Sequence, residues 1–243
     1  MDRSNQPFEV ERLGRMAYAD ALSLQRERHA ALVEGRAQGV PHRVLLVEHP
    51  PVVTVTRRQG AREHVLADEA LLRTSGVELV DTDRGGDVTY HGPGQAIVYP
   101  IVDLQRLGLG VHAYIRALEE AAIRTCAAWR IPCHRQKGAT GVWTGNEGDA
   151  DDATRKIAAI GVRVSRSCTL HGMALNVEPQ LGHFGLIVPC GLHGRVVTSM
   201  RAEVGDECPS FAEASERLAT ETVNALRAAS AAAAVTRPSA KAP

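Results

Sequence analysis

Lysine is scarce in this sequence. Only three lysines, Lys137, Lys156 and Lys241, stand against 25 arginines, and the 28 basic residues are balanced by 28 acidic ones. Dedicated nucleic-acid or membrane-surface binders usually carry a strong basic excess, so zero net charge argues against both classes. With 243 residues, 44% of them apolar and 23% charged, the composition is that of a globular protein that buries a sizeable core.

Paired cysteines and long apolar runs are also missing. The five cysteines form no C-x-x-C pair, and their odd number argues against a disulfide framework and a zinc ribbon. The N-terminus MDRSNQPFEV lacks the apolar core of a signal peptide, and no window approaches the roughly 20 apolar residues of a membrane helix. No two histidines or cysteines have metal-ligand spacing. We therefore expect a reduced, cytoplasmic chain without a metal site.

Helical and strand patterns intermix along the chain. Apolar spacing predicts helices at 11–36, 67–74, 111–129 and 210–229, the last opened by a capping box at 210–213. Short apolar runs predict strands at 43–49, 52–56, 77–81, 96–104 and 169–177, and a hairpin from 138–144 and 156–164. This mixture predicts one α/β domain over residues 1–229, a mixed β-sheet with flanking helices. The tail 230–243, mostly Ala, Ser and Pro, is predicted to be disordered.

The stretch 84–95, RGGDVTYHGPGQ, differs in kind from the rest of the chain. Its four glycines and one proline predict tight turns and close backbone approach. It has neither a Walker pattern nor G-x-G-x-x-G, so a nucleotide-phosphate site is not indicated. Its backbone N–H groups would instead approach a ligand closely, with Arg84 and His91 supplying polar contacts. His91 and His171 would act as hydrogen-bond donors, and a purely structural role for either stays an alternative.

Two single residues are candidates for chemistry. Arginine is effectively never a proton acceptor, so an amine that acts as acid or base must come from a lysine. Lys156 directly precedes an apolar strand run, where its ammonium loses water or pairs with an anion. Cys190 lies in a Pro-Cys-Gly turn that presents its thiol, and a thiolate is a strong nucleophile. The alternatives are a lysine with its head in water and a buried apolar cysteine, the role expected of Cys126 and Cys168.

Five ordered blocks resemble the lipoyl(octanoyl) transferase family of lipoate biosynthesis. The blocks are EHPPV (48–52), RGGDVTYHGPGQ (84–95), KIAAIG (156–161), HGMALNV (171–177) and PCGL (189–192). They follow the family's order between residues 9 and 227, and the glycine-rich block is highly specific. The resemblance implies a fold like the catalytic module of biotin and lipoate protein ligases, with a mixed sheet flanked by helices.

The resemblance also implies an acyltransferase that needs no cofactor. Cys190 would attack the thioester of octanoyl-acyl carrier protein, and a lysine of an apo lipoyl domain would then take the octanoyl group as an amide. The implied acceptors are lipoyl domains of 2-oxoacid dehydrogenase E2 subunits and the glycine cleavage H protein. Lys156 would favour the Cys190 thiolate and move protons in both half-reactions. Small side chains at 158, 159 and 161 would leave room for the acyl chain. The residues implied to bind the acyl substrate are Arg84, Gly85, Gly86, Asp87, Val88, Thr89, Tyr90, His91, Ala159, Ile160, Gly161, Gly172, Met173 and Ala174.

Two other functions stay open. A lipoate or biotin protein ligase shares the implied fold but activates a free acid with ATP, and a non-catalytic carrier-protein or lipoyl-domain binding module would leave the thiol inert. The Cys190 block and the TYHGPG form of the loop favour the transferase. The chain departs from the resemblance at Thr56, where relatives often carry Gly, and in the longer acidic stretch 145–155.

Recognition of the protein partners would depend on local charge. Carrier proteins and lipoyl domains are typically acidic, so local arginine clusters would dock them. We expect a monomer, because no extended apolar stripe is left over. The candidate arginines are Arg57, Arg58, Arg62, Arg163 and Arg166.

Overall fold

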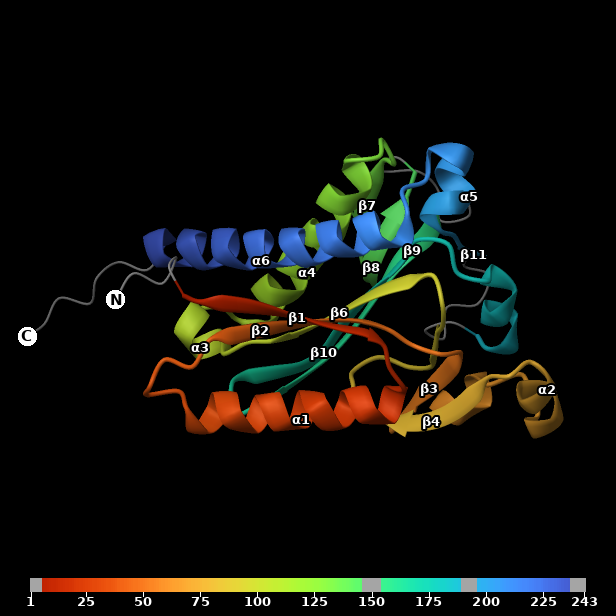
Figure 1. The fold of residues 1–243 in the computed structure, drawn as a ribbon, viewed down its shortest axis with the longest axis horizontal. Helices are drawn as coiled ribbons and strands as arrows, with labels where there is room; N and C mark the ends of the chain where they lie inside the picture. The colour runs from red at the N-terminus through yellow and green to blue at the C-terminus, as the bar shows by residue number, and fades with distance from the viewer. Residues whose placement is uncertain (1–5, 146–153, 189–195, 237–243) are drawn as a thin grey trace, which may run out of the picture.

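A large mixed sheet forms the centre of the protein in the computed structural model, which describes residues 6–145, 154–188 and 196–236 (Figure 1). Its strands lie in the order β1-β2-β6-β10-β9-β8-β7, with β11 paired to β9. Neighbours are antiparallel except for the β1–β2 and β11–β9 pairs. The strands are β1 (Phe8–Arg15), β2 (His42–Glu48), β6 (Gln95–Ile101), β7 (Cys133–Gln136), β8 (Ala139–Thr144), β9 (Arg155–Ser165), β10 (Cys168–Asn176) and β11 (Val196–Val197).

Helices cover both faces of this sheet, so the predicted α/β class is confirmed (Figure 1). Along β6, Ile97 and Tyr99 point into the cluster under α1 (Tyr18–Glu34), while Ala96 and Val98 point to the opposite face. There α4 (Val111–Ala127) packs beside α6 (Phe211–Thr236). Short helices α3 (Leu104–Leu107), α5 (Met200–Val204) and η5 (Gly205–Glu207) connect these elements. Within the described ranges, no helix has the length and apolar character needed to cross a bilayer.

A second, three-stranded sheet stands at one end of the large one (Figure 1). Its order is β4 (Glu78–Thr82), β3 (Val52–Thr56) and β5 (Thr89–His91). The short helices η2 (Ala61–His64), α2 (Glu69–Thr74) and η3 (Leu181–Leu186) pack with it around an apolar cluster that includes Tyr90 and Phe184. Because β5 lies inside the glycine-rich stretch, this small sheet holds that stretch in place.

The predicted helix at 11–36 is wrong over residues 11–17, because α1 begins only at Tyr18. Residues 8–15 instead form β1, which pairs in parallel with β2 from Phe8 opposite His42 to Arg15 opposite Glu48. Phe8 and Val10 lie two residues apart and both pack against the core, as expected in a strand. This period of two is set by the pairing with β2, which is distant in sequence. The pairing register shifts between Arg12 and Gly14, which breaks the alternation just where a helical period seemed to begin.

The predicted disorder from residue 230 is also wrong up to residue 236. Helix α6 begins with the predicted capping box, in which Glu213 N–H donates to Ser210 Oγ and Ser210 N–H donates to Glu213 Oε2, and continues to Thr236. Ser230 is fully buried and donates a 2.8 Å hydrogen bond to Leu107 O, while Ala229 and Ala233 pack against the main core. Alanine's high helix propensity and this docking extend the helix. Residues 237–243 lie outside the described residues.

Candidate active site

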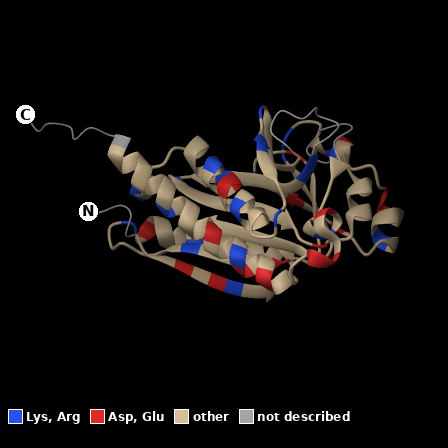
Figure 2. Ribbon diagram, turned by 90° about the horizontal axis from the view of Figure 1, so that it is seen from above, with Lys and Arg blue, Asp and Glu red and all other residues tan. Residues whose placement is uncertain are grey.

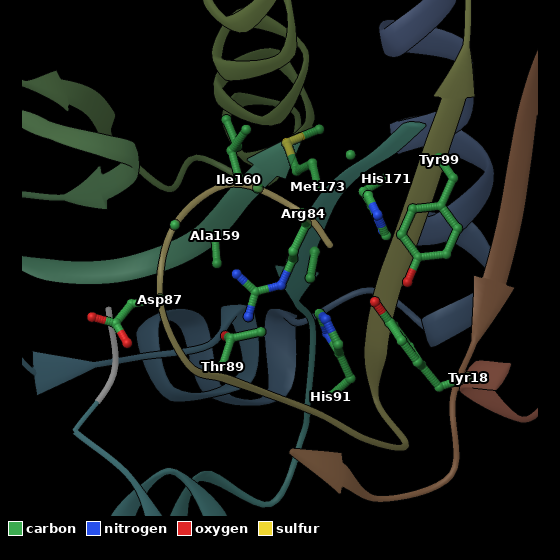
Figure 3. Close-up of a pocket in the computed structure, with 14 residues that line it drawn as sticks. Tyr18, Arg84, Asp87, Thr89, His91, Tyr99, Ala159, Ile160, His171 and Met173 are labelled. Atoms are coloured by element: carbon green, nitrogen blue, oxygen red, sulfur yellow. The ribbon is translucent and has the colours of Figure 1, made fainter. Parts of the chain in front are cut away.

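A cavity lies between the glycine-rich stretch and the middle of β9 and β10 (Figure 3). Side chains from α1, β5 and β6 complete its wall, and Arg84 lies in the middle of the ring of residues. The cavity brings together most of the residues expected to bind an acyl group, which come from three separate sequence blocks. Its lining residues are Tyr18, Arg84, Gly86, Asp87, Thr89, His91, Tyr99, Ala159, Ile160, Gly161, His171, Gly172, Met173 and Ala174.

Three expected substrate residues take other places. Gly85 N–H donates to Val162 O at 2.9 Å and so ties the glycine-rich stretch to β9. Val88 is fully buried in the small-sheet core, and Tyr90 packs edge-on against Phe184 in the same core. The expectation that Ala158 leaves room for the chain is wrong, because Ala158 faces the opposite core under α4.

Two glycines allow the close packing around this cavity. Gly161 of β9 lies opposite Gly172 of β10. A Cβ on Gly172 would lie 2.2 Å from Val98 O, and a Cβ on Gly161 would lie 2.9 Å from Gly85 O. Any side chain at either position would push strands or the glycine-rich stretch apart, so these glycines set the width of the cavity.

The tip of the glycine-rich stretch is tied to the end of β3. Thr56 Oγ1 donates a 3.1 Å hydrogen bond to Gly86 O, at a residue with φ 94°. Arg84 donates to Thr54 Oγ1 at 2.9 Å and to Thr54 O at 3.1 Å. Asp87 Oδ1 accepts from Val88 N–H at 2.8 Å. Thr56, the departure noted in the sequence, therefore serves here as an anchor for the tip.

The part of the cavity wall formed by Tyr18 and Tyr99, with His49 behind it, is polar but uncharged. His49 donates from Nδ1 to Met16 O at 2.7 Å, so its Nε2 accepts from the Tyr99 hydroxyl at 2.9 Å. Burial lowers the pKa of His49 and raises the pKa of Tyr99 well above its ordinary value. The Tyr18 hydroxyl contacts Thr82 Oγ1 at 2.7 Å, and burial raises its pKa as well. These groups stay neutral at physiological pH and suit an uncharged ligand.

His91 begins a chain of buried hydrogen bonds. The Gln95 amide nitrogen donates to Asn176 Oδ1 at 3.0 Å, so its carbonyl oxygen accepts from His91 Nδ1 at 3.0 Å. Asn176 Nδ2 in turn donates to Thr198 O at 2.8 Å. Burial, with the nearby His49 and Arg84, lowers the pKa of His91 to about 3. A neutral His91 therefore keeps Nε2 as an acceptor.

His171 is held by an ion-pair cluster. Its φ is 59°, a left-handed conformation within β10, and its Nε2 lies 2.8 Å from Asp83 Oδ1. Burial lowers the pKa of His171 although Asp83 opposes this. For Asp83, burial is outweighed by His171, Arg163 and Arg26, which together hold its pKa below the ordinary value. His91 and His171 are therefore residues of the cavity wall whose protonation state does not change near physiological pH.

Lys156 lies in a second, smaller cavity next to the first. The side chain is 7% exposed, and its ammonium lies 5.3 Å from the centroid of the Trp143 ring. Thr89 and Ala159 line both cavities. The lysine is thus buried beside the expected acyl site, which excludes the alternative of a lysine with its head in water. The smaller cavity is lined by Thr89, Tyr90, Gln95, Lys156, Ala159, Asn176, Phe184 and Val197.

Cys190 lies outside the described residues, as do residues 146–153 of the acidic stretch. The residues just before and just after the segment that contains Cys190 are described. Val188 N–H donates to His64 O at 2.7 Å, and after the gap Val197 pairs with Lys156 in the β11–β9 register. Cys126 and Cys168 are fully buried, as expected for apolar cysteines. Among the described residues, no group of three or more acidic, His or Cys side chains forms a metal site.

Several wall residues were not foreseen from the sequence. Tyr18 comes from α1 and Tyr99 from β6, and neither was singled out as a site residue. Only a compositional signal could have found them, since the chain has four tyrosines in all. His49, behind Tyr99, lies in the EHPPV block but was given no role. A tyrosine in an otherwise apolar strand needs a hydrogen-bond partner, and His49 is that partner.

The five candidate arginines lie on two separate stretches of the chain. Arg57, Arg58 and Arg62 follow β3, whereas Arg163 and Arg166 lie at the far end of β9. Arg62 pairs with Asp81 at 2.7 Å, and Arg163 pairs with Asp83. Figure 2 shows basic and acidic residues interspersed over helices and strands. That local arginine clusters dock acidic partners stays a prediction.

Comparison with protein families gives one matching family. The model described as "Lipoyl protein ligase A/B catalytic domain" matches residues 17–223. A protein named octanoyltransferase from Acidobacterium capsulatum is 50% identical over 203 residues, which is 80% of either chain. Octanoyltransferases from Bacteroides fragilis (46% over 211 residues, 86% of this chain and 93% of the relative) and Mycolicibacterium gilvum (43% over 221 residues, 91% and 86%) are similar to it as well.

Ligases are among the solved structures that share this fold. A lipoate-protein ligase A bound with ATP superposes with a TM-score of 0.67 at 16% identity, over 90% of this chain and 85% of that one. The bipartite lipoate protein ligase of Thermoplasma acidophilum gives 0.66 at 15% identity, over 91% and 84%. These likenesses concern the arrangement of helices and strands.

Proposed function

Because this chain belongs to the lipoyl protein ligase A/B catalytic-domain family, with octanoyltransferases among its relatives, we propose that its cavity holds the octanoyl group of a thioester intermediate. The chain is an acyltransferase, and octanoyl transfer in protein lipoylation is the activity its relatives support. In the proposal, octanoyl-acyl carrier protein is the donor and a lysine of an apo lipoyl domain, from E2 subunits or the H protein, is the acceptor.

One observation supports this proposal more than any other: the cavity that holds the buried Lys156 adjoins the expected acyl cavity and shares Thr89 and Ala159 with it. From Ala159, which lines both cavities, to Val162, opposite His171, β9 advances three residues, or roughly 10 Å. An extended octanoyl chain is about 9 Å long, given C–C bonds of about 1.5 Å. A chain whose carbonyl lies near Lys156 therefore ends before the Tyr99–His171 wall.

The proposed chemistry has two half-reactions on Cys190. Lys156 takes the thiol proton, the thiolate attacks the donor carbonyl, and the carbon–sulfur bond to the carrier breaks. The departing carrier thiolate receives the proton from Lys156. The acceptor amine then attacks the enzyme thioester, its proton passes to Lys156, and the bond to Cys190 breaks to leave an amide. Thioester-to-amide transfer is downhill, so the scheme needs no ATP.

The surroundings suit both steps of this scheme. The wall histidines with lowered pKa and tyrosines with raised pKa leave Lys156 as the group that exchanges protons near the carbonyl. Each tetrahedral intermediate needs hydrogen-bond donors for its oxygen, and backbone N–H groups of the glycine-rich stretch and around Gly172 are our candidates.

The test separates transferase from ligase and from a binding module. Purified protein and an apo lipoyl domain are incubated with octanoyl-carrier protein, with free octanoate and ATP, or with free octanoate alone. We expect octanoylation of the domain only in the carrier arm. Octanoylation only with ATP would instead make the protein a ligase, as its structural neighbours are named. No octanoylation in any arm would leave a binding module.

A further inference from the structure

His64 contacts both the cavity wall and the chain that leads to the proposed nucleophile. It is the last residue of η2, and the proposed reaction assigns it no role. Its Nδ1 lies 2.9 Å from Asp87 Oδ2, and its carbonyl oxygen accepts a 2.7 Å hydrogen bond from Val188 N–H. Asp87 lines the acyl cavity, and Val188 stands two residues before Cys190.

Asp87 is a buried carboxylate, and the nearest of its ion-pair contacts is with the His64 imidazole. Its side chain is 2% exposed, and Oδ1 already accepts from Val88 N–H, which leaves Oδ2 for His64. Arg58 approaches the same oxygen only to 3.5 Å, from a side chain that is 66% exposed. Solvent screens a pair of that kind, so His64 contributes more to the position of Asp87.

The backbone around His64 is paired with the chain leading to Cys190. Leu66 N–H and Ala67 N–H both donate to Leu186 O, at 2.9 and 3.1 Å, and Val65 forms an antiparallel bridge with Ile187. With the His64–Val188 bond, these contacts join 64–67 to 186–188 as a short ladder. The backbone of His64 thus contacts the chain leading to Cys190, and its imidazole contacts Asp87 of the cavity wall.

We propose that His64 is a positioning residue that fixes the Asp87 wall of the acyl cavity relative to the chain leading to Cys190. This inference rests on the proposed function. Losing the imidazole leaves the backbone ladder intact but removes the contact that holds Asp87 Oδ2, while Thr56 still anchors Gly86. The acyl carbonyl then spends less time in the geometry for attack, which slows acylation more than it weakens binding.

The experiment compares two substitutions at this position. His64→Leu keeps bulk but removes the polar contact, whereas His64→Asn places an amide nitrogen near the position of Nδ1. Intact-mass spectrometry follows acylation of the protein by octanoyl-carrier protein over a range of donor concentrations. We expect His64→Leu to slow saturated acylation about tenfold, with a half-saturating concentration within about twofold of wild type. His64→Asn should retain most of the rate.

Two controls distinguish the positioning role of His64 from a general effect on folding. His112→Ala changes an exposed histidine on α4 and should acylate like wild type. In an Asp87→Ala background, His64→Leu should cause no further loss. A wild-type rate in His64→Leu, or an equal loss in His64→Asn with an unchanged melting temperature, would overturn the positioning role alone. A wild-type protein that is never acylated would overturn the proposed function on which that role rests.

Discussion

Gly141 lies against the Lys156 side chain, and its replacement by alanine tests whether the position of that lysine matters. Gly141 has a φ of 128°, a region that side chains rarely adopt. A Cβ there would lie 2.6 Å from Ala158 O and 2.7 Å from Lys156 Cε. The backbone of β9 is paired with β8 and β10 and cannot shift easily, so the added methyl group displaces the Lys156 side chain.

Gly138 provides a matched control for this substitution. It also has a positive φ, 79°, but a Cβ there would meet no described atom within 4 Å. Alanine in the left-handed region costs about 1 to 2 kcal/mol at Gly138. At Gly141, farther from that region, the backbone strain is about 1 to 3 kcal/mol, and the crowding adds about 1 to 3 kcal/mol. Gly138→Ala should therefore lower the free energy of unfolding modestly, and Gly141→Ala should lower it clearly more.

Two measurements decide the outcome. Denaturant unfolding gives the two free energies, and octanoyl transfer to a lipoyl domain is measured at a temperature where both variants are folded. Gly138→Ala should transfer at the wild-type rate, whereas Gly141→Ala should lose at least about tenfold, a part of what general acid–base catalysis contributes. A folded Gly141→Ala protein with wild-type transfer would refute the reasoning that the Lys156 position is critical.

Three further predictions concern charge, the loop anchor and pH. Lys156→Arg should lose about a hundredfold in transfer rate, because a guanidinium keeps the charge but accepts no proton; wild-type turnover would leave only an electrostatic role. Thr56→Val should raise the Michaelis constant for the acyl donor several-fold by removing the bond to Gly86 O, and Thr56→Ser should restore it. Burial lowers the pKa of His42 to about 4 and, with nearby His49 and Arg84, that of His91 to about 3. The free energy of unfolding should therefore be highest above about pH 6.5 and fall as pH drops towards 4, since the unfolded chain binds more protons. A pH-independent value over that range would contradict these environments.

Local sequence predicts the parts of this fold that depend on local contacts. The β8–β9 hairpin, the capping box of α6 and the special backbone of the glycine-rich stretch are all present. Strand β1 could not be predicted, because only its pairing with β2 selects a period of two over a helical period. The last turns of α6 could not be predicted either, since they depend on Ser230 docking at Leu107.

Some residues of the candidate site could be predicted from the sequence, and others could not. The glycine-rich stretch and Lys156 are recognisable because their residue types are unusual in their places. The wall made by Tyr18, His49 and Tyr99 arises where α1, the β2–β3 connection and β6 meet, and no motif in the sequence marks that meeting. The anchoring of Gly86 by Thr56 also depends on the small sheet, whose strands are far apart in sequence.

The central claim is that octanoyl transfer passes through a thioester on Cys190, and intact-mass spectrometry tests it most directly. The protein is mixed with octanoyl-carrier protein, its mass is measured, and an apo lipoyl domain is then added. With a thioester on Cys190, we expect one octanoyl group on the wild-type protein, its loss to the added domain, and no modification of Cys190→Ala. An unmodified wild-type mass, or an octanoyl group that persists in Cys190→Ala, would contradict the account.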